Sequence, residues 1–232
     1  MARQYPIFIT NPGANNAQVV IKWSLVLFVF NWLSHWLFLD EISIINMFLY
    51  GLVIAGLLLG FFKFTEPEHA LKLTQNGFYY FHRRGEVYCP WSNVLRIDIP
   101  NLSEDFDGGD LNLIGIRFRE PEEFYQSIPL RLASRILVEQ RPLWFGAAKQ
   151  SCQSGTCVPE EFIDSVEHKS DAGTHYKGLI AMFVYRYELL ARLLGFQLYI
   201  PVSSCDESIY KLLNLLKEVK KESDRLDFDP LP

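Results

Sequence analysis

The chain has 232 residues, of which 49% are hydrophobic, and a formal net charge of −5. Residues 1–63 hold three basic and two acidic side chains, a balance of +1, so residues 64–232 carry a net charge of −6. An acidic domain of this kind argues against nucleic acid as a partner, because such binding depends on Lys and Arg that neutralise phosphates.

Two long apolar stretches, residues 19–39 and 42–62, follow an N-terminal segment of residues 1–18 and are separated only by Asp40 and Glu41. At about 1.5 Å per residue, each stretch is long enough for the hydrocarbon core of a bilayer. The sequence therefore predicts a transmembrane helical hairpin within residues 19–64. The first stretch is longer than the apolar run of a cleavable signal peptide, so we expect it to stay as an anchor.

Flanking charges predict how the hairpin is inserted. Basic residues precede the first stretch and follow the second, whereas the turn between them carries only acid. By the positive-inside rule, both ends are expected to lie in the cytoplasm and the Asp40-Glu41 turn to face out. Cys89, Cys152, Cys157 and Cys205 are then expected to be free thiols.

Polar and small residues inside the stretches suggest how the helices pack. Asn31 needs a partner in hydrocarbon, and counting outward from the turn places Tyr50 at its level. Gly56 and Gly60 form a small-xxx-small pattern that permits close approach. Packing within one hairpin is the first interpretation, and a bond between Asn31 and its copy in a homo-oligomer is the alternative.

From residue 66 the pattern predicts an α+β domain that extends to residue 222. Alternating apolar residues predict at least four antiparallel strands between residues 71 and 118, with turns at Gly77 and Gly85. Helices are expected at 121–140, 174–194 and 207–223, with a strand at 196–202. Residues 223–232 are expected to be a disordered tail.

Several short motifs of this domain resemble those of known protein families. They are Leu73-Thr74-Gln75-Asn76-Gly77, Arg84-Gly85, Pro90-Trp91-Ser92-Asn93-Val94, Arg96-Ile97 and Gly115-Ile116-Arg117. With the two spans, they resemble the bacterial pleckstrin-homology-like (PH-like) membrane proteins over roughly residues 20–120. Two further motifs, Ile128-Pro129-Leu130-Arg131-Leu132-Ala133 and Glu139-Gln140-Arg141-Pro142, make the chain similar to an uncharacterised bacterial membrane family known only as a domain of unknown function.

The resemblance implies a fold class and a type of function. The fold class is a membrane α-helical hairpin plus an α+β soluble domain, in which an antiparallel PH-like bent sheet is packed against helices. Such a fold is a binding platform, so the resemblance transfers no catalytic residues.

Candidate metal sites are weak in this sequence. Cys152 and Cys157 precede His168 and His175, but the spacing does not give two clear ligand pairs for zinc. The acidic run at 105–110 lacks the Glu that ends a calcium-binding EF-hand loop. We expect no metal and no cofactor.

The basic residues Lys63, Lys72, Arg83 and Arg84 suggest a patch at the inner membrane face, where each charge near anionic lipid is worth about 1 kcal/mol. The plainer interpretation is that they are topology signals and ordinary strand surface.

Three functions remain, in this order. The first is a non-enzymatic, membrane-anchored platform for a protein partner or an assembly. The second is a module that binds anionic lipid headgroups. The third is an enzyme of an unrecognised class, which a deep polar pocket with convergent titratable groups would favour.

Overall fold

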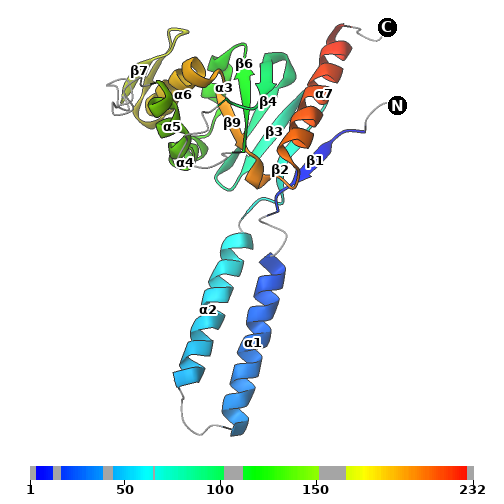
Figure 1. The fold of residues 1–232 in the computed structure, drawn as a ribbon, viewed down its shortest axis with the longest axis vertical. Coiled ribbons are helices and arrows are strands. Elements are labelled where there is room, and N and C mark those ends of the chain that lie inside the picture. Colours follow the sequence, from blue (N-terminus) through cyan, green and yellow to red (C-terminus); the bar gives the residue numbers. More distant parts are fainter. Residues whose placement is uncertain are drawn as a thin grey trace. The chain divides into compact units, whose positions relative to one another are not determined.

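The computed structural model describes residues 4–12, 17–38, 44–64, 66–101, 112–151 and 166–228. The chain forms two compact units, one of Thr10–His69 and one of Met1–Ile9 with Ala70–Pro232. Figure 1 shows the elements of both units.

The first unit is a pair of antiparallel helices, α1 (Ala17–Phe38) and α2 (Ile44–Phe64). Both are long and apolar enough to cross a membrane, with mean hydropathies of 1.4 and 2.2 over Ala17–Leu37 and Ile44–Phe64. Large apolar side chains cover their outer surface, for example Phe30 and Phe48. The Asp40-Glu41 turn lies outside the described residues.

The second unit contains two antiparallel sheets and a hairpin. The four-stranded sheet has the order β1-β2-β3-β4, from Ile7–Thr10, His69–Leu73, Gly77–His82 and Gly85–Pro90. The three-stranded sheet has the order β5-β6-β9, from Val94–Asp98, Leu113–Phe118 and Leu198–Pro201. The hairpin pairs β7 (Glu167–Lys169) with β8 (His175–Lys177). The described part of the unit is therefore of the α+β class.

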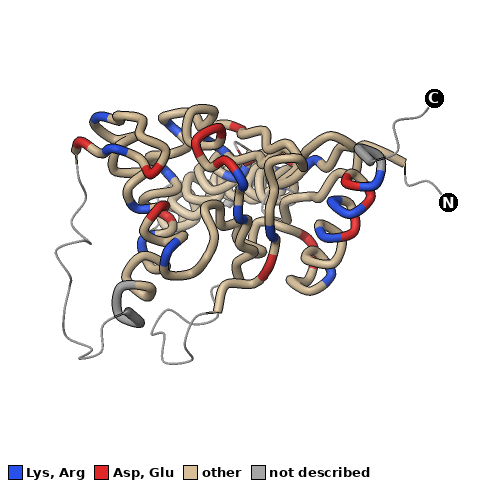
Figure 2. Tube along the Cα trace, turned by 90° about the horizontal axis from the view of Figure 1, so that it is seen from above, with Lys and Arg blue, Asp and Glu red and all other residues tan. Residues whose placement is uncertain are grey.

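Five α-helices, besides the short 3-10 helices Trp91–Asn93 and Val202–Ser204, complete the described part of this unit. They are α3 (Pro121–Ser127), α4 (Leu130–Glu139), α5 (Arg141–Ser151), α6 (Gly178–Leu194) and α7 (Ile209–Phe228). Helices α4, α5 and α6 gather on one side of the sheets and α7 lies on the other (Figure 1). Figure 2 shows Lys and Arg interspersed with Asp and Glu along α7, next to the C-terminus, so its outer side is not a patch of one sign.

The core lies between the sheets and the helices. Trp91 is fully buried, tilts against Phe78 at 5.1 Å between ring centroids, and donates its indole N–H to the carbonyl of Thr74 at 2.9 Å. On α6, Phe183 stacks on Tyr187 with 4.4 Å between centroids. These aromatic side chains fill the space that the short strands leave, and aromatic burial dominates the energetics of such small cores.

Strand β1 comes from the N-terminal segment. The sequence pattern predicts this segment, residues 1–18, but no strand within it. Strand β1 lies beside β2 in the four-stranded sheet, so the chain leaves this sheet for the helical hairpin and returns to a neighbouring strand. Four residues are too few for local periodicity to predict a strand, and the pairing with β2 decides it.

Two helix predictions were wrong in extent. The helix expected at 121–140 is broken into α3 and α4, because Pro129 lacks an N–H and disfavours helical geometry at Ile128. The tail expected from residue 223 is helical as far as Phe228, and the buried side of this helix includes Val219 and Ser223. Residues 229–232 lie outside the described part.

Candidate functional site

Three polar side chains of the helical hairpin, Ser24, Asn31 and Asn46, are buried. Asn31 is 1% exposed and Asn46 is 4% exposed, whereas the outer surface is apolar. The Nδ2 of Asn31 donates to the backbone carbonyl of Asn46 at 3.5 Å. Tyr50, the partner expected for Asn31, instead lies edge-on to Phe28 at 6.1 Å. Counting from the turn misplaced the pair by one helical turn, because it ignores the side-chain packing that sets the register.

Gly56 and Gly60 lie where the two helices approach each other. A Cβ atom at Gly56 would fall 2.3 Å from Ser24 Oγ, and one at Gly60 would fall 2.4 Å from Ile21 Cγ1. At either distance the neighbouring side chain or the helices would have to shift, so the two glycines permit this close approach.

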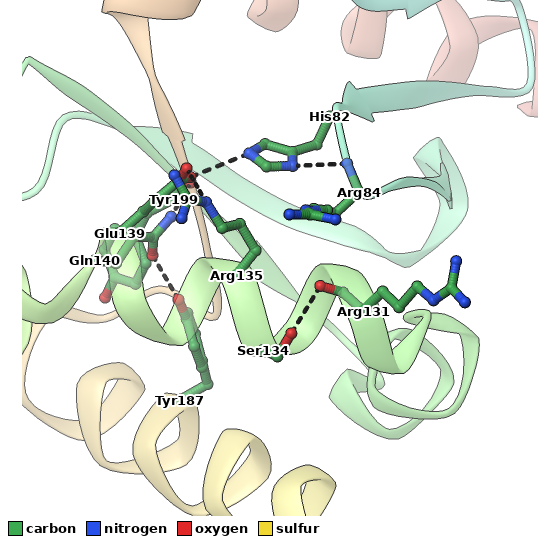
Figure 3. A network of polar contacts seen from close by, with 9 residues as sticks. All are labelled: His82, Arg84, Arg131, Ser134, Arg135, Glu139, Gln140, Tyr187 and Tyr199. Carbon is green, nitrogen blue, oxygen red and sulfur yellow. Dashed lines mark hydrogen bonds and ion pairs between the residues drawn. The ribbon is translucent and has the colours of Figure 1, made fainter. Parts of the chain in front are cut away.

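Three arginines of the second unit line one pocket. We call it the arginine pocket; it has a volume of about 340 Å³ and is lined by Arg84, Arg131, Ser134, Arg135 and Val138. Arg84 comes from the turn between β3 and β4, and the other residues come from α4. Figure 3 shows Arg84 above α4, between Arg131 and Arg135.

A polar network behind the pocket holds its parts in place. His82 Nδ1 accepts a hydrogen bond of 3.2 Å from the backbone N–H of Arg84, so Nε2 carries the proton that faces Glu139 Oε2 at 3.1 Å. Glu139 Oε1 accepts a bond of 2.6 Å from Arg135 Nε. The hydrogen bond from His82, with a further one from Arg135, lowers the pKa of Glu139 although burial opposes it. Glu139 is therefore a carboxylate that fixes one arginine of the pocket.

The expected basic patch is only partly brought together. Arg84 lines the arginine pocket, and Arg83 is its exposed neighbour in the same turn. Lys72 instead lies over the rings of Phe8 and Tyr79, at 5.7 and 5.5 Å from their centroids. Lys63 belongs to the other unit. Sequence reasoning missed Arg131 and Arg135, whose i,i+4 spacing shows only that they share one side of a helix.

The outer face of the four-stranded sheet carries a row of aromatic side chains. Lys72, Tyr79 and Tyr88 are directly paired across β2, β3 and β4, and so share one face. Tyr79 contacts Tyr88 at 4.8 Å and Phe81 at 6.2 Å. We call this set, with Phe8 from β1, the aromatic face. Phe8 and Tyr88 are 47% and 39% exposed, so part of this set is open to solvent.

A larger pocket, the polar cleft, has a volume of about 560 Å³ and lies between α3, the end of α6 and the residues near the β7–β8 turn. Its titratable lining residues are Arg117, Glu122, Tyr125, Asp171, Glu188 and Arg192. This is the kind of pocket that favours an enzyme, but its most buried carboxylate is engaged internally. Glu188 contacts His168 Nε2 at 2.7 Å and accepts a bond from the Asp171 N–H at 2.9 Å. That arrangement fastens the β7–β8 hairpin to α6.

Tyr125 adds one unsatisfied group to the cleft. It is 2% exposed, and its hydroxyl has no hydrogen-bond partner among the described residues. Burial, helped by the charges of Glu188 and Asp171, raises its pKa, so the phenol stays protonated.

Metal binding finds no support in the described part of the chain, where no group of three or more His, Cys, Asp or Glu is placed to hold an ion. Cys152, Cys157 and the acidic run at 105–110 lie outside the described residues. Cys89 and Cys205 are free and buried, and burial raises the pKa of the Cys205 thiol to about 12. Such a thiol is protonated at neutral pH and therefore a poor nucleophile.

Comparison with models of protein families gives a match that covers most of the sheet unit. The model of a family described as "Protein of unknown function (DUF2982)" matches residues 71–222, well over half of the chain. The chain belongs to this family. No curated protein matches it, and no solved structure matches it.

The DUF2982 match contains every residue of the arginine pocket and of the polar cleft. It begins inside β2 and ends inside α7, so the helical hairpin and β1 lie outside the matched region. The family thus covers the sheets and helices that build both pockets, and its description assigns them no activity.

Proposed function

We propose that this DUF2982 protein is a membrane-anchored, non-enzymatic binding module. One observation carries the anchor: α1 and α2 place large apolar side chains outward and Ser24, Asn31 and Asn46 inward. Water would penalise so large an exposed apolar surface, whereas hydrocarbon tolerates it and favours inward polar groups. The hairpin then spans the inner membrane of a bacterial cell, with both ends in the cytoplasm.

The sheet unit is proposed to be a PH-like domain. Four-stranded and three-stranded antiparallel sheets, with the last helix α7 packed against β5 and β6, support this assignment. The helices α3–α6, inserted between β6 and β9, are an addition to the simplest form of such a domain.

The function of this domain is proposed to be a platform for a protein partner, and the aromatic face is the proposed contact surface. Aromatic side chains are enriched where proteins bind, since they bury a large area with little loss of conformational entropy. Lys72, held over two of the rings, would give the surface a preference for acidic partners.

The anchor is tested by extraction and by topology. The full chain should stay in the membrane pellet after carbonate or high-salt washing and dissolve only in detergent. A reporter that fluoresces only in the cytoplasm should be bright when fused after Pro232. Release without detergent would refute the anchor, and a dark reporter would refute the orientation.

The platform is tested with a photo-crosslinking amino acid at Tyr88 in intact cells. Tyr210, 71% exposed on α7, is the matched control position. We expect a discrete crosslinked product from Tyr88 that weakens when Tyr79 becomes Ser, with no such product from Tyr210. Equal crosslinking from both positions would refute a specific contact on the aromatic face.

A second candidate function is binding of anionic lipid headgroups by the domain. The arginine pocket favours it, because three arginines line it and one of them, Arg135, is bonded to Glu139.

A further inference from the structure

The arginine pocket collects positive charge that the described part of the protein does not neutralise. Arg135 is bonded to Glu139, whereas the guanidinium groups of Arg84 and Arg131 have no acidic partner among the described residues. Like charges drawn into one small pocket repel each other, and a bound anion would remove this repulsion.

We infer that the arginine pocket binds a phosphate group, carried by a lipid headgroup or by a small soluble phosphate ester. This inference rests on the second function proposed above and names its site. Guanidinium groups match the oxygens of phosphate with paired hydrogen bonds, which single ammonium groups do not. Four of the five residues that line the small pocket carry polar or charged groups, so it suits a charged group.

The pocket is built before any ligand arrives. Gly85 has a φ of +147°, in the region that favours glycine, and a Cβ there would lie 3.5 Å from Pro129 Cγ. The β3–β4 turn therefore lies against the start of α4, which carries Arg84 over the helix. His82 accepts from the Arg84 backbone and faces Glu139, which in turn holds Arg135. Such preorganisation reduces the entropy lost on binding.

The position of Arg131 in α4 adds to the attraction for an anion. Arg131 lies in the first turn of this ten-residue helix, where the helix dipole favours negative charge. The anion would thus meet the arginine side chains and the positive end of the helix together.

The test uses the full chain in neutral detergent micelles, with two sources of phosphate. Glycerol phosphate is titrated by calorimetry, and retention of phosphatidylglycerol is compared with that of phosphatidylcholine by native mass spectrometry. Arg84→Ala and Arg131→Ala should each weaken binding about tenfold or more, since bonds to charged groups are removed. Arg84→Lys should restore only part of the affinity, because the paired hydrogen bonds are lost.

Arg83→Ala is the matched control. Arg83 has the same charge and lies in the same turn, but it does not line the pocket. A general effect of surface charge would make Arg83→Ala and Arg84→Ala equally harmful, and this result would overturn the site. Absence of binding by the unaltered protein to both phosphate sources would overturn it too. Circular dichroism of each variant confirms that it is folded; should Arg131→Ala fail, Arg131→Gln replaces it.

The two sources are separated by the two measurements. Retention of phosphatidylglycerol that depends on Arg84 assigns the pocket to lipid headgroups. Binding of glycerol phosphate without retention of phosphatidylglycerol assigns the pocket to soluble phosphate esters. This result would confirm the phosphate site and refute the proposed lipid-binding function. Neither result alters the carbonate extraction or the crosslinking from Tyr88, so failure of the pocket is distinguishable from failure of the anchor or of the platform.

Discussion

Tyr5 donates a hydrogen bond of 2.8 Å from its hydroxyl to Oε2 of Glu222, although 217 positions separate the two residues. The bond joins the segment before β1 to the last helix, α7. The N-terminal segment is therefore part of the sheet unit on two counts, its place beside β2 and its bond to α7.

Tyr5→Phe removes this bond and keeps the ring. Because the acceptor is a carboxylate and the pair is partly buried, the free energy of unfolding of the sheet unit should fall by about 1–2 kcal/mol. Chemical denaturation of the full chain in detergent, followed by tryptophan fluorescence, measures the change. Tyr210→Phe, on the exposed side of α7, should leave the midpoint unchanged, and equal losses from both variants would contradict the assigned role of Tyr5.

Gly60→Ala should loosen the contact between α1 and α2. The new methyl group would meet Ile21 Cγ1 at 2.4 Å, so the helices must separate or the side chain must shift, at a cost of about 1–3 kcal/mol. Titration with SDS in mixed micelles measures the stability of the hairpin. Gly51→Ala is the control, since nothing lies within 4 Å of a Cβ there. Equal stability of the two variants would show that the helices do not pack through Gly60.

Glu188→Leu should destabilise the sheet unit severely. Glu188 is 6% exposed, and its loss leaves the partly buried His168 side chain and the Asp171 N–H without their acceptor, at a cost of about 3–5 kcal/mol. Thermal unfolding of the full chain in detergent is the measurement. Glu167→Gln breaks an exposed ion pair with Lys177 in the same hairpin and should cost less than about 1 kcal/mol. If both losses were small, Glu188 would not be the residue that fastens the hairpin.

The free energy of unfolding of the sheet unit should fall at acid pH, because Glu139 becomes protonated there. Its pKa in the folded protein lies below the ordinary value of 4.5, chiefly because of the hydrogen bond from His82. Its contribution is therefore fully present above pH 4.5 and is lost as the pH falls through the folded pKa. The difference in unfolding free energy between neutral and acid pH should be smaller for Glu139→Gln than for the unaltered chain. Glu86→Gln, an exposed position on β4, serves as the control; equal changes in the two variants would contradict the assignment.

The sequence alone determined the elements whose signal is local. The two apolar stretches appear as α1 and α2, the alternation from Leu71 to Phe118 appears as β2–β6, and Gly195 ends α6 in the left-handed conformation. Each of these signals depends on the burial or backbone preference of residues near one another in the chain, which periodicity and glycine placement report directly.

Tertiary structure alone decided what comes together from distant parts of the chain. It placed β1 beside β2, paired β9 with β6, and brought Arg84 over Arg131 and Arg135. It also gave Asn31 the backbone carbonyl of Asn46 as its partner, where the sequence predicted Tyr50. A sequence pattern shows which side of an element is buried, but not what buries it. The packing that satisfies all elements at once is a property of the whole chain, and both candidate pockets arise from that packing.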